Sequence, residues 1–282
     1  MIMWIASYPK SGNTWVRSLL TSYFYSKDGN FDFKLLPKIY QFPAKRFFTE
    51  YKKNFTNITD TAEFWLDAQK KINSDGSFKL FKTHNAFLDV NNFKFTDTSN
   101  TAGCVYIVRD PRNVITSIKN HYEHNYEEAL NFMLNDKGLL YEKINNQFVN
   151  FQFLSSWRNH YKSWIDNNKF FPIKVVKYEE LENNTIKVLE EIVNFINSVA
   201  KFKNNFDFKK AAKCVESTNF DLLRKKEIAS GFNEAPIGQK TKKKIIFFNL
   251  GKKNNWKKLL SKEMLDKINS IFKDDLKKLG YN

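Results

Sequence analysis

The sequence predicts an α/β protein in which a central, mostly parallel sheet is flanked by helices. Three observations support this fold class. Short apolar segments typical of buried strands alternate with segments of helical periodicity. The chain opens on a strand, a tight loop and a helix, a P-loop-like arrangement. Polar clusters follow four expected strands at the edge where parallel sheets bind ligands. Neither an internal repeat nor a linker is visible, so we expect one domain over residues 1–282.

Residues 2–25 organise the rest of the chain. Residues 2–6 are apolar and predict a buried strand, residues 7–14 are rich in turn formers, and apolar side chains then recur at helical spacing. Such a turn directs free backbone N–H groups and the positive end of a helix at one point, which suits an anion. Gly12 allows close approach, Lys10 adds a charge and Thr14 a hydroxyl. An ordinary strand-to-helix turn is the alternative interpretation.

The next elements are less uniform. Residues 26–75 are mixed, apart from an amphipathic helix expected over residues 61–72. Residues 77–84 and 102–108 predict two strands, and a helix is expected from Asn113. Residues 123–170 are expected to be helical, with a stripe formed by Phe148, Phe151, Phe153, Leu154, Trp157, Tyr161 and Trp164.

The remaining pattern predicts a strand over residues 173–178 and a helix over residues 185–196. Residues 201–244 carry no clear strand signal, residues 231–238 indicate a loop, and the lysine-rich residues 240–244 indicate a solvated surface segment. A polar residue or group lies at the end of each of four expected strands: Lys10, the group Lys82-Thr83-His84, Arg109 and Tyr178. Because parallel strands end at one edge, the sequence predicts a single shared anion site.

Composition narrows the class of protein. The 46 Lys and Arg against 30 Asp and Glu give a net charge of +16, which favours anionic ligands, nucleic acid or acidic surfaces. The 28 Phe among 42% hydrophobic residues supply a core. Cys104 and Cys214 lack metal-ligand spacing, so we expect reduced thiols in a cytoplasmic protein. No run reaches the length of a membrane span, and no metal is expected.

Residues 8–15 read aromatic-Pro-Lys-Ser-Gly-x-Thr-Trp. This segment resembles the 5′-phosphosulfate loop of the sulfotransferases that use 3′-phosphoadenosine 5′-phosphosulfate (PAPS). The lysine precedes the only glycine, so the segment is not the nucleotide loop with two glycines and a terminal Lys-Ser/Thr. The resemblance implies that the co-substrate binds Lys10, Ser11, Gly12, Asn13, Thr14 and Trp15.

Residues 105–117 are similar to the segment of that family that holds the 3′-phosphate. Arg109 offers a planar fork to phosphate oxygens, and Ser117 adds a hydroxyl from the following helix. Without the first motif, a salt bridge at a strand end is an equally good interpretation of Arg109.

Residues 81–84 resemble the family's Lys-Thr-His, in which the histidine is the catalytic base. The resemblance assigns proton removal from the acceptor to His84, charge neutralisation on the sulfuryl oxygens to Lys82, and stabilisation of the leaving oxygen to Lys10. The other histidines, His121, His124 and His160, lack such context and are expected to have no role.

Residues 247–257 match a third family block, Arg-Lys-Gly-x-x-Gly-x-Trp-Lys, only in part. Gly251 and Trp256 fit, but Asn249 replaces the arginine that grips the 3′-phosphate, and Leu250 replaces the lysine. Asn254 replaces the second glycine, a change that tolerance of the left-handed conformation makes mild. Weaker resemblances add Lys252 to the co-substrate site and place Trp15, Tyr178, Thr218 and Phe220 around the adenine. For Thr218 and Phe220, a place in the core is an equally good interpretation.

The sequence therefore predicts in-line sulfuryl transfer from PAPS to a hydroxyl, or an amine, of a small acceptor. A nucleoside or nucleotide kinase and a basic nucleic-acid-binding protein are the alternatives, and we expect no nucleic-acid partner. Residues 26–75 and 123–170 would build the acceptor pocket and say little about the acceptor. Dimerisation is left open: Lys257, Ser261, Lys262 and Asp266 align with a family dimer contact, but Lys262 puts a charge where the family has Val.

Overall fold

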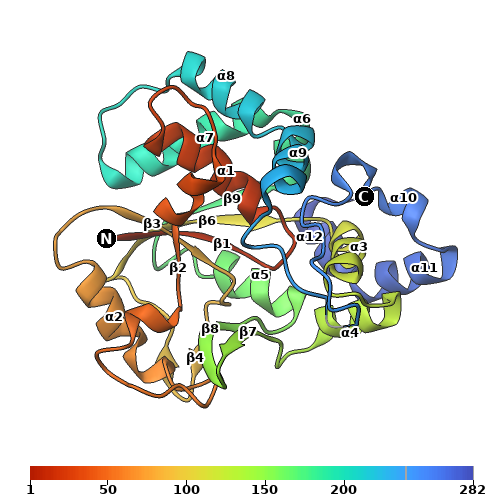
Figure 1. Ribbon diagram of the computed structural model, residues 1–282, viewed down its shortest axis with the longest axis horizontal. Coiled ribbons are helices and arrows are strands. Elements are labelled where there is room, and N and C mark those ends of the chain that lie inside the picture. Colours follow the sequence, from red (N-terminus) through yellow and green to blue (C-terminus); the bar gives the residue numbers. More distant parts are fainter. Residues whose placement is uncertain (239, 282) are drawn as a thin grey trace.

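The computed structural model describes residues 1–238 and 240–281. Its centre is a five-stranded sheet in the order β2-β3-β1-β6-β9, with every neighbouring pair parallel (Figure 1). The strands are β1 (Ile2–Ser7), β2 (Tyr40–Gln41), β3 (Lys79–Thr83), β6 (Thr101–Val108) and β9 (Ile173–Lys177). The predicted α/β class with a central parallel sheet is therefore confirmed.

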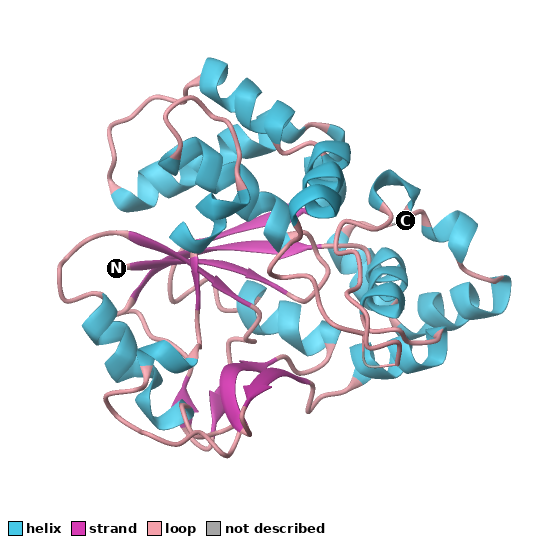
Figure 2. Ribbon diagram, in the orientation of Figure 1, coloured by secondary structure: helices cyan, strands magenta, loops and turns pink. Residues whose placement is uncertain are grey.

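Helices cover both faces of this sheet (Figure 2). The side chains of β1 alternate between two cores: Ile2, Trp4 and Ala6 belong to one, and Met3 and Ile5 to the other. The helices are α1 (Asn13–Tyr25), α2 (Trp65–Ile72), α3 (Pro111–His121), α4 (Tyr126–Leu134), α5 (Trp157–Ile165), α6 (Tyr178–Asn183), α7 (Thr185–Ala200), α8 (Phe208–Ser217), α9 (Phe220–Ser230), α10 (Trp256–Leu259), α11 (Lys262–Ile271) and α12 (Lys273–Leu279).

Helix boundaries differ slightly from the expected ones. The helix expected over residues 61–72 begins as a 3₁₀ turn, Ala62–Phe64, and continues as α2. The helix expected from Asn113 begins at Pro111, because the side chain of Asp110 caps it by accepting a hydrogen bond from the N–H of Arg112 at 2.9 Å.

The expectation that residues 123–170 are helical throughout was wrong. This segment contains an antiparallel hairpin, β7 (Leu139–Ile144) and β8 (Gln147–Phe153), between α4 and α5. A β-bulge shifts the register, since Glu142 pairs with Asn150 while Lys143 pairs with Phe148. The extra residue lets Phe148 and Phe151, three positions apart, both reach the core and imitate helical spacing.

Three two-residue strands were not predicted: β2, β4 (Asp89–Val90) and β5 (Phe93–Lys94). Segments this short cannot show an alternating pattern. β2 nevertheless matters, because it extends the sheet beside β3, the strand that ends next to His84.

Candidate active site

The carboxyl ends of four strands open into one cavity of about 900 Å³. Its walls include Lys10, Lys82, His84, Arg109 and Tyr178, which come from the ends of β1, β3, β6 and β9. These are the strand-end groups that the sequence predicted to converge, apart from Thr83, which is buried and not part of the wall.

The loop between β1 and α1 approaches Tyr178 so closely that it needs a glycine. Gly12 has a φ of 104°, and a Cβ atom there would lie 2.6 Å from the Tyr178 ring. Lys10 also adopts a positive φ, 67°, which turns this loop sharply at the mouth of α1. Gly12, Asn13, Thr14 and Trp15 line the cavity, whereas the predicted Ser11 is buried outside its wall.

Arg109 is held flat against the same loop. Its guanidinium lies 3.8 Å from the centre of the Tyr178 ring, and Nη1 donates to the carbonyl of Lys10 at 3.2 Å and to Oγ of Ser117 at 3.4 Å. Across residues 1–238 and 240–281, Arg109 forms no ion pair and its buried Nε has no hydrogen-bond partner. The charge and one N–H are therefore available to an anion, which disfavours a structural salt bridge.

Lys10 has an unexpected neighbour. Its Nζ donates a hydrogen bond to Nδ1 of His121 at 3.0 Å and lies 4.1 Å from the centre of the Phe247 ring. Burial, assisted by the positive charge of Arg109, lowers the pKa of Lys10 from 10.5 to about 7. His121 was expected to have no role. Its position four residues after Ser117 on α3 was the available signal, because such residues share a helix face.

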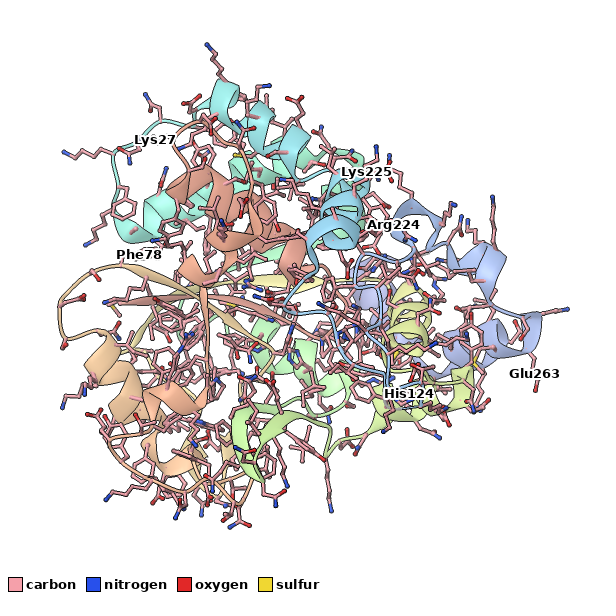
Figure 3. All side chains as sticks on the ribbon, viewed as in Figure 1. Lys27, Phe78, His124, Arg224, Lys225 and Glu263 are labelled. Atoms are coloured by element: carbon pink, nitrogen blue, oxygen red, sulfur yellow. The ribbon has the colours of Figure 1, made fainter. Side chains whose placement is uncertain are left out.

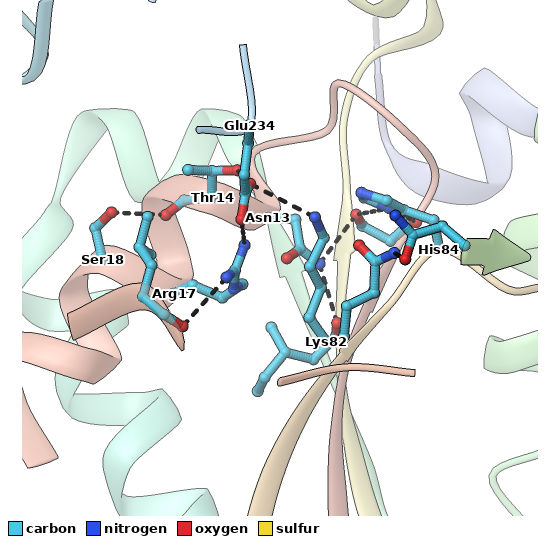
Figure 4. Close-up of polar contacts among 12 residues, drawn as sticks. Asn13, Thr14, Arg17, Ser18, Lys82, His84 and Glu234 are labelled. Atoms are coloured by element: carbon cyan, nitrogen blue, oxygen red, sulfur yellow. Dashed lines mark hydrogen bonds and ion pairs between the residues drawn. The ribbon is translucent and has the colours of Figure 1, made fainter. Parts of the chain in front are cut away.

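Glu234 adds a carboxylate to this basic site (Figure 4). It accepts hydrogen bonds from Nη1 of Arg17 at 2.7 Å and from Oγ1 of Thr14 at 3.2 Å, and it lies 3.5 Å from Nζ of Lys82. Although burial opposes ionisation, the charges of Arg17 and Lys82 keep the pKa of Glu234 well below its usual 4.5. Sequence reasoning missed Glu234, because this residue lies in the aperiodic loop after α9 and belongs to no motif.

His84 is fixed by three contacts. Its Nδ1 donates to the carbonyl of Ser7 at 2.7 Å, its backbone N–H donates to Oε1 of Gln152 at 2.7 Å, and its carbonyl accepts from Nε2 of His160 at 3.0 Å. Burial and the nearby Lys82 lower the pKa of His84 well below 6.5. The imidazole is therefore neutral near pH 7, and Nε2 is its acceptor nitrogen.

The remaining predicted residues line the far part of the same cavity: Ser117, Thr218, Phe220, Gly251 and Lys252. Gly251 has a φ of 51°, and a Cβ there would meet the Phe220 ring at 2.5 Å. Asn249 also lines this part, with its carbonyl accepting from Arg224.

The expected reason for Asn254 was wrong. Its φ is −74°, so no left-handed backbone is needed. Instead its side-chain amide donates to Oγ of Ser117 at 2.8 Å and to the carbonyl of Asn113 at 3.0 Å. Asn254 thus links the third block, residues 247–257, to α3 by side-chain hydrogen bonds.

Comparison with known proteins shows the family of the chain. The family model "Sulfotransferase domain" matches residues 2–280. The chain is 20% identical to mouse sulfotransferase 1B1 over 269 residues (95% of this chain, 80% of that protein), and 22% identical to cytosolic sulfotransferase 16 of Arabidopsis thaliana (98% and 76%).

Solved structures show the same fold at low identity. Mouse sulfotransferase SULT7A1 complexed with PAP has a TM-score of 0.58 at 15% identity, covering 98% of this chain and 84% of that one. Retinol dehydratase in a complex with retinol and PAP has a TM-score of 0.60 at 15% identity, covering 98% and 81%.

The fold is that of an α/β enzyme of the sulfotransferase class. The chain belongs to the sulfotransferase family, the PAPS-dependent enzyme family that its motifs resemble. In the part of the chain that the structure describes, no helix is long and apolar enough to cross a membrane.

Proposed function

We propose that this enzyme transfers the sulfuryl group of PAPS to a hydroxyl or an amine of a small acceptor, with His84 as the base. The observation that carries this proposal is the convergence of Lys10, Lys82, Arg109 and a neutral His84 on one cavity beside the N-terminus of α1. Three basic side chains and a helix N-terminus suit a nucleotide with two anionic groups, the 3′-phosphate and the 5′-phosphosulfate. The neutral imidazole suits the removal of the acceptor proton.

In the proposed step, the acceptor oxygen or nitrogen forms a bond to sulfur while Nε2 of His84 takes its proton. The bond from sulfur to the bridging phosphate oxygen breaks, and its electron pair stays on that oxygen. The products are the sulfated acceptor and adenosine 3′,5′-bisphosphate (PAP). Lys10 would stabilise the leaving oxygen and Lys82 the sulfuryl oxygens.

The nucleotide would lie along the cavity from the α1 loop to the third block. Thr14 and the first N–H groups of α1 would hold the 5′-phosphosulfate, and Arg109 with Ser117 the 3′-phosphate. Trp15, Tyr178, Thr218 and Phe220 would surround the adenine, and Gly251 with Lys252 would close that end. The PAP-bound structures of SULT7A1 and retinol dehydratase support this use of the cavity.

The phosphate loop and the net charge bear on the two alternatives. A nucleotide kinase would need a lysine after the second glycine of its phosphate loop, whereas Lys10 precedes Gly12, the only glycine of this loop. Lys27, after α1, and Lys225, on α9, are two of the many cations (Figure 3), and a net charge alone does not distinguish a nucleic-acid binder from an enzyme with an anionic co-substrate. Independence from metal stays a prediction.

Mass spectrometry tests the proposal most directly. The purified protein and PAPS are incubated with a panel of hydroxylated and amino compounds, and products are searched for an added sulfuryl group. Binding of PAP, ATP and single-stranded DNA is measured in parallel at two salt concentrations. PAP should bind best, whereas strong, salt-sensitive binding of DNA with no sulfated product would contradict the proposal.

Cytoplasmic location stays a prediction, and the sequence leaves a homodimer open. Lys257, Ser261, Lys262 and Asp266 are exposed around the start of α11, where the aligned dimer contact would lie. Light scattering on the purified chain measures the oligomeric state, and a charge reversal at Lys262 should shift a dimer at this surface toward the monomer.

A further inference from the structure

We infer that the acceptor is a hydrophilic, polyhydroxylated compound of the sugar class, recognised by Gln41, Asn150 and Glu142. This inference rests on the proposed function and concerns the part of the cavity beyond His84. None of the three residues belongs to the motifs that predicted the reaction. They come from the short edge strand β2 and the hairpin β7–β8.

Backbone pairing fixes these side chains beside the reacting groups. Gln41 pairs with Lys82 in the parallel register of β2 and β3, two residues before His84. Asn150 precedes Gln152 by two positions on β8, so their side chains share one face of the strand. Gln152 accepts the backbone N–H of His84 at 2.7 Å. The wall next to the imidazole is therefore built of amide side chains, and all of these residues line the cavity.

The side chains form a continuous chain of hydrogen bonds. Nε2 of Gln41 donates to Oδ1 of Asn150 at 3.1 Å, and Nδ2 of Asn150 donates to Oε2 of Glu142 at 2.5 Å. Each amide can make up to four hydrogen bonds, so this arrangement leaves donors and acceptors free toward the cavity. The amide of Gln152, in contrast, is already occupied, because its Nε2 donates to the carbonyl oxygens of Pro43 and Phe151. It is thus a support for His84, whereas Gln41 and Asn150 are the recognising groups.

Aromatic side chains also line the cavity, together with aliphatic ones such as Leu140 and Ile246. Tyr122, which follows α3, and Phe247 of the third block line it, and Tyr141 of β7 lines it while remaining 58% exposed. A sugar ring presents hydroxyl groups at its edge and C–H groups on its face, so it matches a cavity with an amide wall and aromatic surfaces. A wholly apolar acceptor would remove water from the amides and return no hydrogen bond.

Glu142 adds a charge preference. Its carboxylate ends the hydrogen-bond chain and belongs to an exposed position of β7 within the cavity wall. An amino group on the acceptor would be attracted to it, whereas a carboxylate would be repelled. Among sugars of similar size, an amino sugar should therefore be preferred over a neutral one and a uronic acid should be the poorest.

A competition experiment with purified full-length protein and PAPS tests the inference. The probes are glucosamine, glucose and glucuronate on one side, and 4-nitrophenol and androsterone on the other, with products counted by mass spectrometry. The expected result is sulfation of the sugars with a higher kcat/KM than the phenol or the sterol, in the order amino, neutral, acidic. A higher kcat/KM for 4-nitrophenol or androsterone overturns the inference and leaves the proposed function standing. Sulfation of none of them, in a protein that binds PAP, counts against both.

Two variants assign the recognition to its residues. Asn150→Leu and Gln41→Leu keep similar volume and remove the amides, so KM for the best sugar should rise about three- to tenfold each. PAP affinity should stay constant, because neither residue belongs to the proposed nucleotide end, and this readout also shows that the variants fold. Asn146→Gly, at the exposed turn of the same hairpin with a φ of 59°, is the matched control and should change neither value. Unchanged KM in both leucine variants overturns the assignment.

Discussion

The carboxylate of Glu234 accepts a hydrogen bond from Nη1 of Arg17 at 2.7 Å, immediately beside the loop proposed to hold the phosphosulfate. Arg17 is only 3% exposed, and the same carboxylate reaches Thr14 and Lys82. An internal anion therefore neutralises part of the basic site. Since Lys82 and Thr14 are proposed to contact the co-substrate, Glu234 competes with it for the same partners.

The variant Glu234→Gln should tighten PAP binding about five- to tenfold. The amide keeps the size of the side chain but removes a negative charge close to the expected phosphate, which outweighs the weaker contact with Arg17. Calorimetry at low and moderate salt measures the change, and the gain should shrink as salt rises.

Glu123→Gln is the control for this variant. Glu123 accepts the backbone N–H of Lys240 at 2.7 Å and of Thr241 at 3.1 Å, so it holds the same connecting segment without lining the cavity. Glu123→Gln should therefore not tighten the binding of PAP. Weaker PAP binding in Glu234→Gln would instead mean that the Arg17–Glu234 pair supports the closed site.

The variant His84→Ala should lower turnover by roughly 10²–10⁴-fold while PAP affinity barely moves, because the base contacts the acceptor. In the wild type, the acid limb of the kcat profile should lie below pH 6.5, since burial and Lys82 lower the pKa of His84. Activity falls as pH drops through that value because the imidazole is then protonated. His160→Asn, which removes the contact to the His84 carbonyl and the hydrogen bond with the Tyr106 hydroxyl but leaves the base itself in place, should lose less.

How much of this site follows from sequence depends on where each group lies. Lys10, His84 and Arg109 follow strands, and Lys82 lies near the end of one. The apolar runs of these strands are local signals, so the convergence was predictable. Glu234 and Gln41 come from an irregular loop and a two-residue strand, which carry no periodicity. The position of Asn150 could not be predicted, because the β-bulge gives the apolar residues of β8 a helix-like spacing.

Lys10 and Arg109 should give different phenotypes. Lys10→Ala should slow the chemical step more than it weakens binding, because charge on the leaving oxygen develops only in the transition state. Arg109→Ala should mainly weaken PAP binding, by about 1.5–3 kcal/mol for a charge-assisted contact. Single-turnover kinetics and calorimetry separate the two effects, and exchanged phenotypes would mean that the nucleotide lies the other way round.

Binding of PAP should depend on pH through Lys10. The pKa of Lys10 is about 7 in the free protein because of burial and Arg109, and a bound phosphate raises it. Only the protonated form of Lys10 favours binding, so the affinity for PAP is highest below pH 7. Above pH 7 the affinity falls by up to roughly tenfold per pH unit, until the pH reaches the raised pKa of Lys10 in the complex. The phosphates, with a second pKa of about 6, are already ionised in this range.

The matched variant is Lys10→Arg, which keeps the positive charge at every pH of the experiment. Its PAP affinity should be nearly constant between pH 7 and 9. If it keeps the slope of the wild type, another group takes up the proton.

Asn249 marks the clearest departure from the family pattern. It lines the nucleotide end of the cavity beside Gly251 and Lys252, at the position where the family has an arginine for the 3′-phosphate. Arg112 does not replace that arginine, because its guanidinium pairs with Asp110 at 2.7 Å and lies over the Trp256 ring at 4.1 Å. Lys252 lines the cavity and can supply charge, but an ammonium lacks the planar fork that fits phosphate.

Asn249→Arg should therefore tighten PAP binding by about 1 kcal/mol, the gain of a charge-assisted contact over a neutral amide. Adenosine 5′-monophosphate should bind as before, because it lacks the group that the new side chain grips. Lys253→Arg is the control, since Lys253 is exposed in the same block and does not line the cavity. Calorimetry on both nucleotides decides the question: if PAP gains nothing, or if both nucleotides tighten alike, residue 249 does not face the 3′-phosphate and the alignment of this block is wrong.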